Sequence, residues 1–496
     1  MSGRVIAWLL LAAAFLGTPS PPAAAGEIAN CFSQGLKGSC TERVLENVQF
    51  KAVVLQFVDP GKTDLGESFS RLMWREILDN ISNLANAGVI LAYDRQGEIQ
   101  HALGDKDYRV FLESEYHAAA EAIALQLKTQ MSIWGAVIVD GDGLLVQPFL
   151  TLETGQGPWT TLTMHSGAIR DLALGARIAG SRLNLEPLTA SRQHLFDRPF
   201  VTRCALSAGC PKGVPLRAGA SNDSPIAGYV PVGSSVQAID MQREWIKLRW
   251  QTDKTAYVNI YHLEMFPLRV TFSNRRDVVL RAGPKSASSP VAKVVLDGDY
   301  EVLAAARGAG AEPWYRIRQG SATGWVAGRL VARRSYIFPA VNLIGGLFRY
   351  GRGDYKGATE AFQAYLAEAP EESNVTRAAV YQFLAASRIA GGSSIDRGVK
   401  AAIADLDRSA GLTPFDPAVY NLRAVVQLGS GHGLMEGLKD IERSLNLDPT
   451  DADAQRLLAT MVDLSKRHAL EVLGIDQDLQ AAAGYIDKLR EQYLRT

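Results

Sequence analysis

The chain has 496 residues, of which 47% are hydrophobic and 21% charged, a composition that predicts three or four ordinary globular domains. Its 52 lysine and arginine side chains are balanced by 52 aspartate and glutamate side chains. Because no basic excess is present, the charge argues against binding to nucleic acid or to an anionic membrane.

The first 25 residues have the pattern of a secretory signal peptide. An apolar run at 5–16 is followed by a proline-rich break at 19–22 and by small residues up to Ala25. A run of this length forms a helix shorter than the roughly 30 Å of a membrane core. We therefore predict cleavage after Ala25 and export of the mature chain, with an uncleaved anchor as the alternative. No later stretch is apolar enough to predict a transmembrane span.

The four cysteines form two pairs that are close in the sequence. Cys31 and Cys40 are nine residues apart, and Cys204 and Cys210 are six apart. Neither pair has the Cys-x-x-Cys spacing of a zinc or redox site. Two local disulfides in an oxidising compartment are the plain interpretation, and they agree with export.

Residues 26–195 alternate the patterns of strands and helices, which predicts an α/β sandwich with helices packed on a mixed sheet. Apolar residues at spacings of three and four indicate helices, and short apolar runs indicate strands. The expected elements are a strand at Val53–Val58, a helix from Phe69 to Gly88, a strand at Val89–Tyr93, a helix at Tyr108–Thr129, and a hairpin of Met131–Asp140 and Leu144–Leu152.

Gly61-Lys62-Thr63 lies between the first strand and the first helix, where a nucleotide-binding P-loop would lie. That loop needs another glycine five residues earlier, and Gln56 stands there. Asp64 and Glu67 fit a capping box, which would put carboxylates where phosphates need to bind. We predict a loop leading into a capped helix and no nucleotide site.

The other chemical motifs also favour structural interpretations. The turn at Asp140–Gly143 lacks the glutamate at the twelfth position of a calcium loop, where Thr151 stands. The seven histidines are scattered, and no Gly-x-Ser-x-Gly is present. We therefore expect no catalytic residues, no metal, no cofactor and no enzymatic activity; an active site assembled from distant residues is the alternative.

Residues 198–335 contain many short strands and repeat themselves. The sequence VPLRAG at 214–219 recurs as VVLRAG at 278–283, and TAYV at 255–258 recurs as TGWV at 323–326. This self-similarity predicts two small barrels of roughly 65 residues. We place them at 198–266 and 267–335.

Both copies resemble bacterial SH3-like domains. The second copy carries LRAGP at 280–284, Trp314 and GSATGWV at 320–326, which match the family's pattern. The first copy has Ala220 in place of the proline and Tyr257 in place of the second tryptophan. The resemblance implies binding of peptides or cell-wall material.

Four aromatic residues are the candidates for lining an SH3-like groove, namely Trp245, Tyr257, Trp314 and Trp325. Trp245 and Trp314 have alternating charged neighbours, so we expect them to be the more exposed. Tyr257 and Trp325 fit either a groove or the core of the barrel.

Residues 340–496 are expected to be helical. Three thirteen-residue segments, at 358–370, 402–414 and 437–449, end in proline. With GLFRYGRGDYKGATEAF at 346–362, they resemble a tetratricopeptide (TPR) array closed by C-terminal capping helices. The resemblance implies a solenoid of stacked helix pairs whose concave groove holds peptides or partner proteins.

The N-terminal module resembles the α/β domain of Tol-type translocation proteins and of curli-secretion lipoproteins. The resemblance rests on AVVLQFVD at 52–59 and on SIWGAVIVDGDGLLVQPFL at 132–150. It implies binding of envelope proteins without catalysis.

The sequence as a whole predicts a multidomain α+β protein of the bacterial envelope. We expect an exported, periplasmic or extracellular scaffold, in a Gram-negative-type envelope, that binds envelope proteins, peptides or peptidoglycan through SH3-like and TPR grooves. One alternative is an enzyme that modifies peptidoglycan, or an activator of such an enzyme. Another is an accessory component of a secretion or surface-assembly machine.

Overall fold

A computed structural model of the chain describes residues 48–494 apart from a set of short segments. The segments left out are 82–83, 85, 93–100, 102–115, 142, 154–159, 166–172, 179–181, 192–198, 205–209, 252–253, 266–268, 272–277, 296–298, 308–312, 335–338, 370–371, 393–394, 432, 468–469 and 471–478. The predicted signal peptide and the Cys31–Cys40 pair therefore lie outside the described residues. Within the described part, no helix has the length and apolar character needed to cross a membrane.

The N-terminal module is built on a sheet with the strand order β2-β1-β3-β4-β7, in which β8 also pairs with β4. Strands β1 and β2 are almost wholly buried and pair in parallel, as expected for strands covered on both faces. The elements of the module are β1 (Phe50–Val54), α3 (Leu65–Ile81), β2 (Ala87–Leu91), α5 (His117–Gln126), β3 (Met131–Asp140), β4 (Gly143–Leu152), β5 (Thr161–His165), β6 (Ala173–Arg177), β7 (Arg182–Asn184) and β8 (Leu188–Ser191).

The expected hairpin is present, because β3 and β4 pair without a break from Met131↔Leu152 to Asp140↔Gly143. The expected end of the first helix at Gly88 is wrong. Helix α3 ends at Ile81, and Gly88 belongs to β2, where it pairs with Lys51 of β1. The helix ends before Gly88 because the chain at Gly88 pairs with β1, and a helical spacing of apolar residues cannot reveal this pairing.

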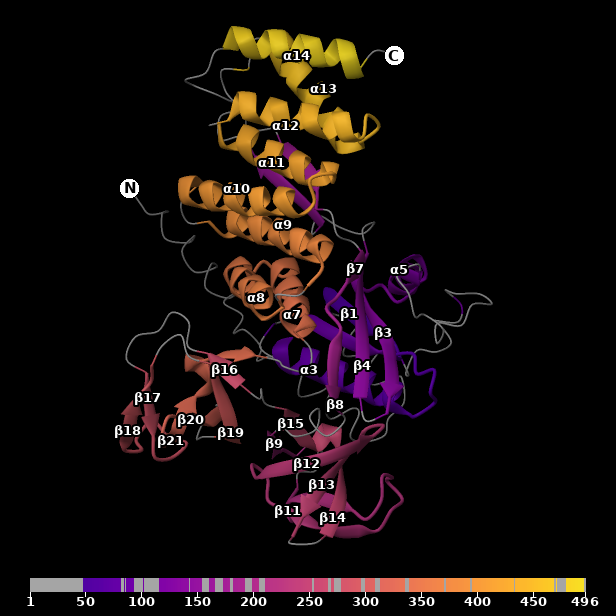
Figure 1. Cartoon of the computed structure of the whole chain (residues 1–496), viewed down its shortest axis with the longest axis vertical. Helices are drawn as coiled ribbons and strands as arrows, with labels where there is room; N and C mark the ends of the chain where they lie inside the picture. The colour runs from indigo at the N-terminus through magenta and orange to yellow at the C-terminus, as the bar shows by residue number, and fades with distance from the viewer. Residues whose placement is uncertain are drawn as a thin grey trace, which may run out of the picture.

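Two units with the same strand order follow the module (Figure 1). The first, called here the first barrel, has the order β11-β10-β14-β13-β12-β9-β15, and the second barrel has β18-β17-β21-β20-β19-β16-β22. The first comprises β9 (Pro199–Thr202), β10 (Val214–Arg217), β11 (Ile226–Val230), β12 (Ser235–Gln242), β13 (Trp245–Trp250), β14 (Lys254–Asn259), the short 3-10 helix η5 (Ile260–His262) and β15 (Leu263–Met265). The second comprises β16 (Arg269–Thr271), β17 (Val279–Arg281), β18 (Pro290–Lys293), β19 (Asp299–Arg307), β20 (Pro313–Gln319), β21 (Ala322–Ala327), η6 (Gly328–Leu330) and β22 (Ala332–Arg334).

The repeated Leu-Arg-Ala-Gly sequence has the same structural role in both barrels. Arg217 donates from Nη1 to the carbonyl oxygen of Ser224 at 2.7 Å, and Arg281 does the same to Ser288 at 2.8 Å. Each arginine thereby closes the turn that follows its strand. The first barrel also carries the predicted disulfide between Cys204 and Cys210.

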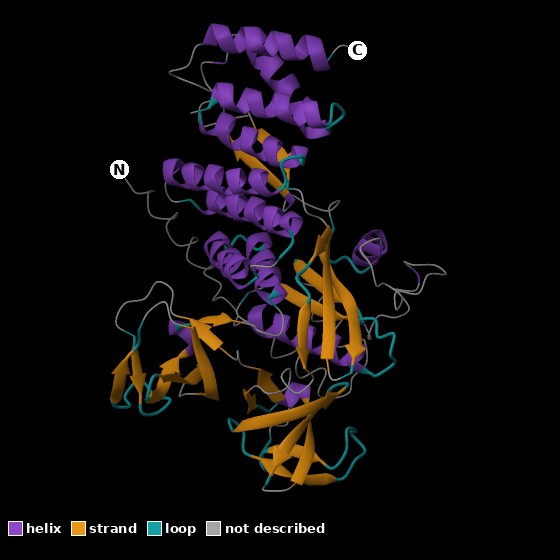
Figure 2. Cartoon of the chain, in the orientation of Figure 1, coloured by secondary structure: helices purple, strands orange, loops and turns teal. Residues whose placement is uncertain are grey.

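The C-terminal region is a stack of helices, each packed against the next along the chain (Figure 2). The three proline-ended segments predicted from the sequence lie largely in α8, α10 and α12. Several helices begin at a side chain that accepts a backbone N–H, such as Asp354 in front of α8 and Asp451 in front of α13. The helices are α7 (Ala340–Gly351), α8 (Tyr355–Glu368), α9 (Asn374–Gly391), α10 (Ile395–Leu412), α11 (Pro417–Ser430), α12 (Leu434–Leu447), α13 (Ala452–Lys466) and α14 (Leu479–Tyr493).

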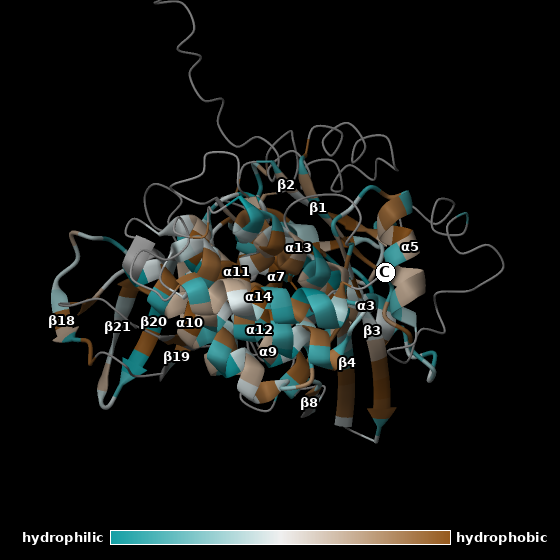
Figure 3. Ribbon diagram, turned by 90° about the horizontal axis from the view of Figure 1, so that it is seen from above, coloured by the Kyte–Doolittle hydropathy of each residue, from teal (hydrophilic) through white to brown (hydrophobic). Residues whose placement is uncertain are grey.

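The module and the helical stack share one hydrophobic core, which also includes the interior of the first barrel. At one end of this contact, the rings of Phe50 in β1 and Phe348 in α7 lie 5.3 Å apart. Gly351 lies against Phe50 so closely that a Cβ atom would clash with its ring. Viewed along the stack, the module's sheet and the second barrel lie at opposite sides of the helices (Figure 3).

The expected mixed α and β content is confirmed by these sheets and helices. The second barrel has a separate hydrophobic cluster, to which the first barrel contributes Val201 from β9. The first barrel is thus joined to the module through a common core, whereas the second contacts the first chiefly through β9 and β19.

Candidate functional site

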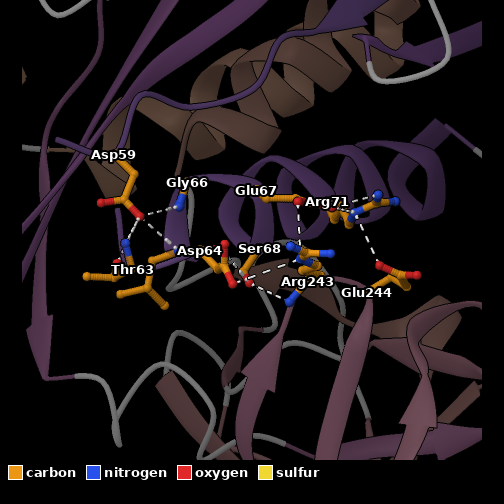
Figure 4. Close-up of polar contacts among 10 residues, drawn as sticks. Asp59, Thr63, Asp64, Gly66, Glu67, Ser68, Arg71, Arg243 and Glu244 are labelled. Carbon is orange, nitrogen blue, oxygen red and sulfur yellow. Dashed lines mark hydrogen bonds and ion pairs between the residues drawn. The ribbon is translucent and has the colours of Figure 1, made fainter. Parts of the chain in front are cut away.

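The loop Gly61-Lys62-Thr63 holds a carboxylate of its own chain where a P-loop would hold a phosphate (Figure 4). Oδ2 of Asp59 accepts hydrogen bonds from the backbone N–H and the hydroxyl of Thr63, both at 2.8 Å, and from the N–H of Leu65 at 3.1 Å. The N-terminus of α3 is therefore already neutralised by an anion. This contact leaves no reason to place a nucleotide there.

The predicted Asp64–Glu67 capping box is wrong. The chain reaches α3 through left-handed backbone conformations at Lys62 and Asp64, with φ of 52° and 62°. This turn brings Asp59 back onto the helix end. Glu67 instead accepts from Arg71 one turn later, with Oε1 2.8 Å from Nη2.

The same helix fixes the first barrel to the module. The N–H of Arg243, in the turn between β12 and β13, donates to Oγ of Ser68 at 3.0 Å. Next to it, Nε of Arg71 lies 3.8 Å from Oε2 of Glu244, and the rings of Trp74 and Tyr261 meet edge to face at 5.9 Å. Figure 4 shows these charged groups pointing toward one another across the junction, which we therefore interpret as structural.

A buried polar cluster fixes α5 to the sheet. Nδ1 of His117 lies 2.7 Å from Oγ1 of Thr151, which also accepts the indole N–H of Trp134 at 2.9 Å. Nε2 of His117 lies 3.1 Å from Oδ1 of Asn184. Burial lowers the pKa of His117, so the ring is held neutral and joins the two side chains. His117 and Thr151 are both buried, and we assign the cluster a structural role.

The candidate site is the outer sheet face of each barrel. In the first barrel, Tyr257 of β14 pairs with Arg217 of β10 on one side and with Lys247 of β13 on the other. Their neighbours Leu216, Ile246 and Val258 point into the core. Alternation along the strands therefore places Arg217, Tyr257 and Lys247 side by side on the outside. The ammonium of Lys247 lies 5.9 Å from the centre of the Tyr257 ring.

The second barrel repeats this row with different residues. Trp325 of β21 pairs with Arg281 of β17 and with Arg316 of β20. Arg316 is exposed, and Arg281 and Trp325 are half-buried. Each row thus has an aromatic ring between two cations. This combination suits a ligand with anionic groups beside a flat or apolar surface.

The four predicted aromatic residues differ in exposure in the reverse of the expected way. Trp245 and Trp314 are each only 4% exposed, so the expectation that they are the more exposed pair is wrong. Trp245 directly follows Arg243 and Glu244, which contact α3. Trp314 lies between Ala306 and Ala327 on the neighbouring strands, whose small side chains leave room for an indole. Both are consistent with a packing role.

Tyr257 and Trp325 are the half-buried pair and lie in the two rows. The cations beside them, Arg217, Lys247, Arg281 and Arg316, were not among the predicted site residues. Aligning the two copies of the repeat would have indicated these positions, because a cation recurs at each of them.

In the described residues, one side of the helical stack, where the TPR resemblance predicts a groove, is covered by the module. Helices α7, α9, α11 and α13 each pack against elements of the module. The hairpin β5–β6 lies on α11 and α13, and in Figure 2 it is the pair of strands among the upper helices. Its Met164 packs on Gly429, where a Cβ atom would come within 2.8 Å. The N–H of Arg177 donates to Oδ2 of Asp453 at 2.8 Å.

A hollow of about 540 Å³ remains between this hairpin and α13. It is lined by Asp453 and Arg456, which bind each other at 2.8 Å, and by the hairpin's Arg177. Because these charges are used in holding the hairpin, we do not assign partner binding to this face. Within the described residues, no group of three or more His, Cys, Asp or Glu side chains could hold a metal ion.

A family model described as a bacterial SH3 domain matches residues 212–263, which lie within the first barrel. The first barrel is therefore similar to that family, as the sequence predicted. No curated protein sequence matches the chain.

Among solved structures, NlpC2 and NlpC1 from Trichomonas vaginalis are each similar at 10% identity. The alignments cover 28% and 32% of this chain and 48% and 49% of those chains, with TM-scores of 0.15 and 0.14. This chain thus spans about half the length of each, and a likeness at these TM-scores carries no argument about fold or activity.

Proposed function

We propose that this protein is a non-catalytic scaffold of the bacterial cell envelope whose two barrels bind cell-wall material. The observation that carries the proposal is the bacterial SH3 match at 212–263, in a barrel that presents Tyr257 between two cations on its outer face. The Cys204–Cys210 disulfide and the predicted signal peptide support an exported protein.

The remaining domains have a supporting role in this proposal. The helical stack, which we interpret as TPR-like, and the module hold the first barrel through a shared core and through the junction at Ser68 and Arg243. A Tol-type origin of the module is also part of the proposal. Two modest binding surfaces on one chain would raise the affinity for a polymer with many repeats of the same ligand.

Co-sedimentation of the mature full-length chain with purified peptidoglycan sacculi tests the proposal. We expect the wild-type protein to pellet with the sacculi, and Tyr257→Ala to reduce the bound fraction several-fold without lowering the melting temperature appreciably. Phe415→Ala is the matched control, because Phe415 is a 79% exposed aromatic residue on the helical stack. It should leave binding unchanged.

Three results would contradict the proposal. The protein could stay in the supernatant, or Tyr257→Ala and Phe415→Ala could reduce binding equally. Release of soluble muropeptides from the sacculi would instead identify a peptidoglycan-modifying enzyme, which is the alternative that the sequence left open.

A further inference from the structure

The two outer rows differ in charge on the strand that follows each row in its sheet, which is β12 in the first barrel and β19 in the second. In the first barrel, Asp240 of β12 pairs with Lys247 and extends the row with a carboxylate. In the second barrel the corresponding residue of β19 is Ala304, which pairs with Arg316. The first row therefore contains its own acid beside a cation, and the second row does not.

The second row is a continuous surface of the second barrel. Strands β17, β21 and β20 are neighbours in the sheet, so Arg281, Trp325 and Arg316 follow one another at about 5 Å per strand. Leu280, Ile317 and Val326, which alternate with them, belong to the barrel's core. The indole therefore lies on the outside with one guanidinium on each side, about 10 Å apart at the backbone.

The barrel positions the guanidinium group of Arg281, and both Arg281 and Arg316 keep donors for a ligand. Arg281 uses Nη1 to bind the carbonyl oxygen of Ser288, and Nη2 of Arg316 lies 3.5 Å from Oγ1 of Thr323. An arginine side chain has five N–H donors in a planar fork, so each can still bind a carboxylate with two parallel hydrogen bonds. Positioned side chains lose less conformational entropy when a ligand binds.

We infer that the row Arg281–Trp325–Arg316 binds an acidic saccharide, with a sugar ring on the indole of Trp325 and carboxylates on the two arginines. This inference rests on the proposed function and names its ligand class for the second barrel. A rigid ring suits a half-buried indole better than a flexible acidic peptide does, because the peptide loses more conformational entropy on binding. A peptide strand also cannot be added within the row, since β17, β21 and β20 already pair with one another.

Isothermal titration calorimetry on the mature full-length chain at low salt tests the inference with three probes. Tetragalacturonate supplies carboxylates on sugar rings, chitotetraose supplies neutral rings, and tetraglutamate supplies carboxylates without rings. We expect tetragalacturonate to bind at least tenfold more tightly than either of the others. Its affinity should fall as salt is added, because both contacts with arginine are ionic.

Two variants assign the binding to the second row. Ala304→Asp introduces into the second barrel the carboxylate that Asp240 supplies in the first, and Arg316→Gln removes one exposed cation. Each variant should weaken tetragalacturonate binding about tenfold and leave the melting temperature unchanged. Arg397→Gln is the control, because Arg397 is an exposed arginine of α10 in the helical stack, outside both rows. It should leave the affinity unchanged.

Equal binding of tetraglutamate would overturn the inference in favour of an acidic peptide. An affinity for tetragalacturonate that neither Ala304→Asp nor Arg316→Gln changes would also overturn it, because the second row would then not be the binding site. The outcome is independent of the sacculus test. If sacculi bind but tetragalacturonate does not, only this inference fails. If tetragalacturonate binds through the second row but sacculi do not pellet the protein, the inference stands and the cell-wall proposal fails.

Discussion

The two barrels have the same strand order but are held in the molecule by different contacts. The first barrel shares its core with the module and is joined to α3 through Ser68, Arg71 and Trp74. The second barrel has a cluster of its own and reaches the rest of the chain mainly through β9. The first barrel therefore shares the hydrophobic core of the module, whereas the second barrel has a largely separate core.

The comparison extends from packing to surface chemistry. The arginine that closes the first turn is the same in both copies, since the fold needs it there. The residue next to the row differs, because Asp240 in the first barrel corresponds to Ala304 in the second. The repeat thus keeps the turn and the cations beside the aromatic ring, and it changes the charge of the residue next to the row.

The largest effect is expected from replacing a buried tryptophan, either Trp74, which packs on the first barrel, or Trp314 in the second barrel. Trp74→Ala should cost about 3–5 kcal/mol and reduce hydrogen-exchange protection in both the module and the first barrel, because Trp74 packs on Tyr261 and donates to the carbonyl of Val89. Trp314→Ala is the matched variant, also buried, and should reduce protection only in the second barrel. If either variant reduced protection in the module and in both barrels, the second barrel would not unfold independently of the other two.

Acid should destabilise the first barrel more than the second. Burial, together with the charges of Arg203 and Arg217, lowers the pKa of His262 to about 4 from 6.5. The unfolded chain therefore binds this proton at a higher pH than the folded chain, so stability is lost as the pH falls from 6.5 toward 4. The loss is on the order of 3 kcal/mol.

His262→Leu tests this pH dependence, because the second barrel has Leu330 at the corresponding end of its 3-10 helix. We expect the urea midpoint of wild-type protein to fall more between pH 7 and pH 4.5 than that of the variant. If both midpoints fall equally, another group controls the acid response.

The smallest effect concerns the single hydrogen bond between helix and barrel. Ser68→Ala removes the acceptor of the Arg243 N–H and should cost about 1 kcal/mol. Hydrogen exchange of the β12–β13 turn measures the local loss, and peptides of the corresponding β19–β20 hairpin serve as the internal control. Unchanged exchange at the first turn would show that Trp74 and Arg71 alone hold the junction.

Local sequence patterns predicted a good part of this architecture. The hairpin of β3 and β4 follows from two apolar runs on either side of Gly141-Asp142-Gly143, and the matching strands of the two barrels follow from the repeated VPLRAG and VVLRAG segments. The cap of α3 by Asp59 was missed, since it depends on a turn with two left-handed non-glycine residues. The exposure of Trp245 and Trp314 was reversed because alternation identifies the face of a strand but not what covers it.

The sequence by itself determined the repeated barrels, the helical C-terminal region and the absence of a P-loop, all of which depend on residue spacing along the chain. Only the tertiary structure decided that the module covers α7, α9, α11 and α13, and that a cation, an aromatic ring and a second cation meet on three neighbouring strands. The physical reason is that spacing fixes hydrogen bonds and turns between near neighbours. The burial of a whole helix face and the register between strands depend instead on contacts between residues far apart in the sequence.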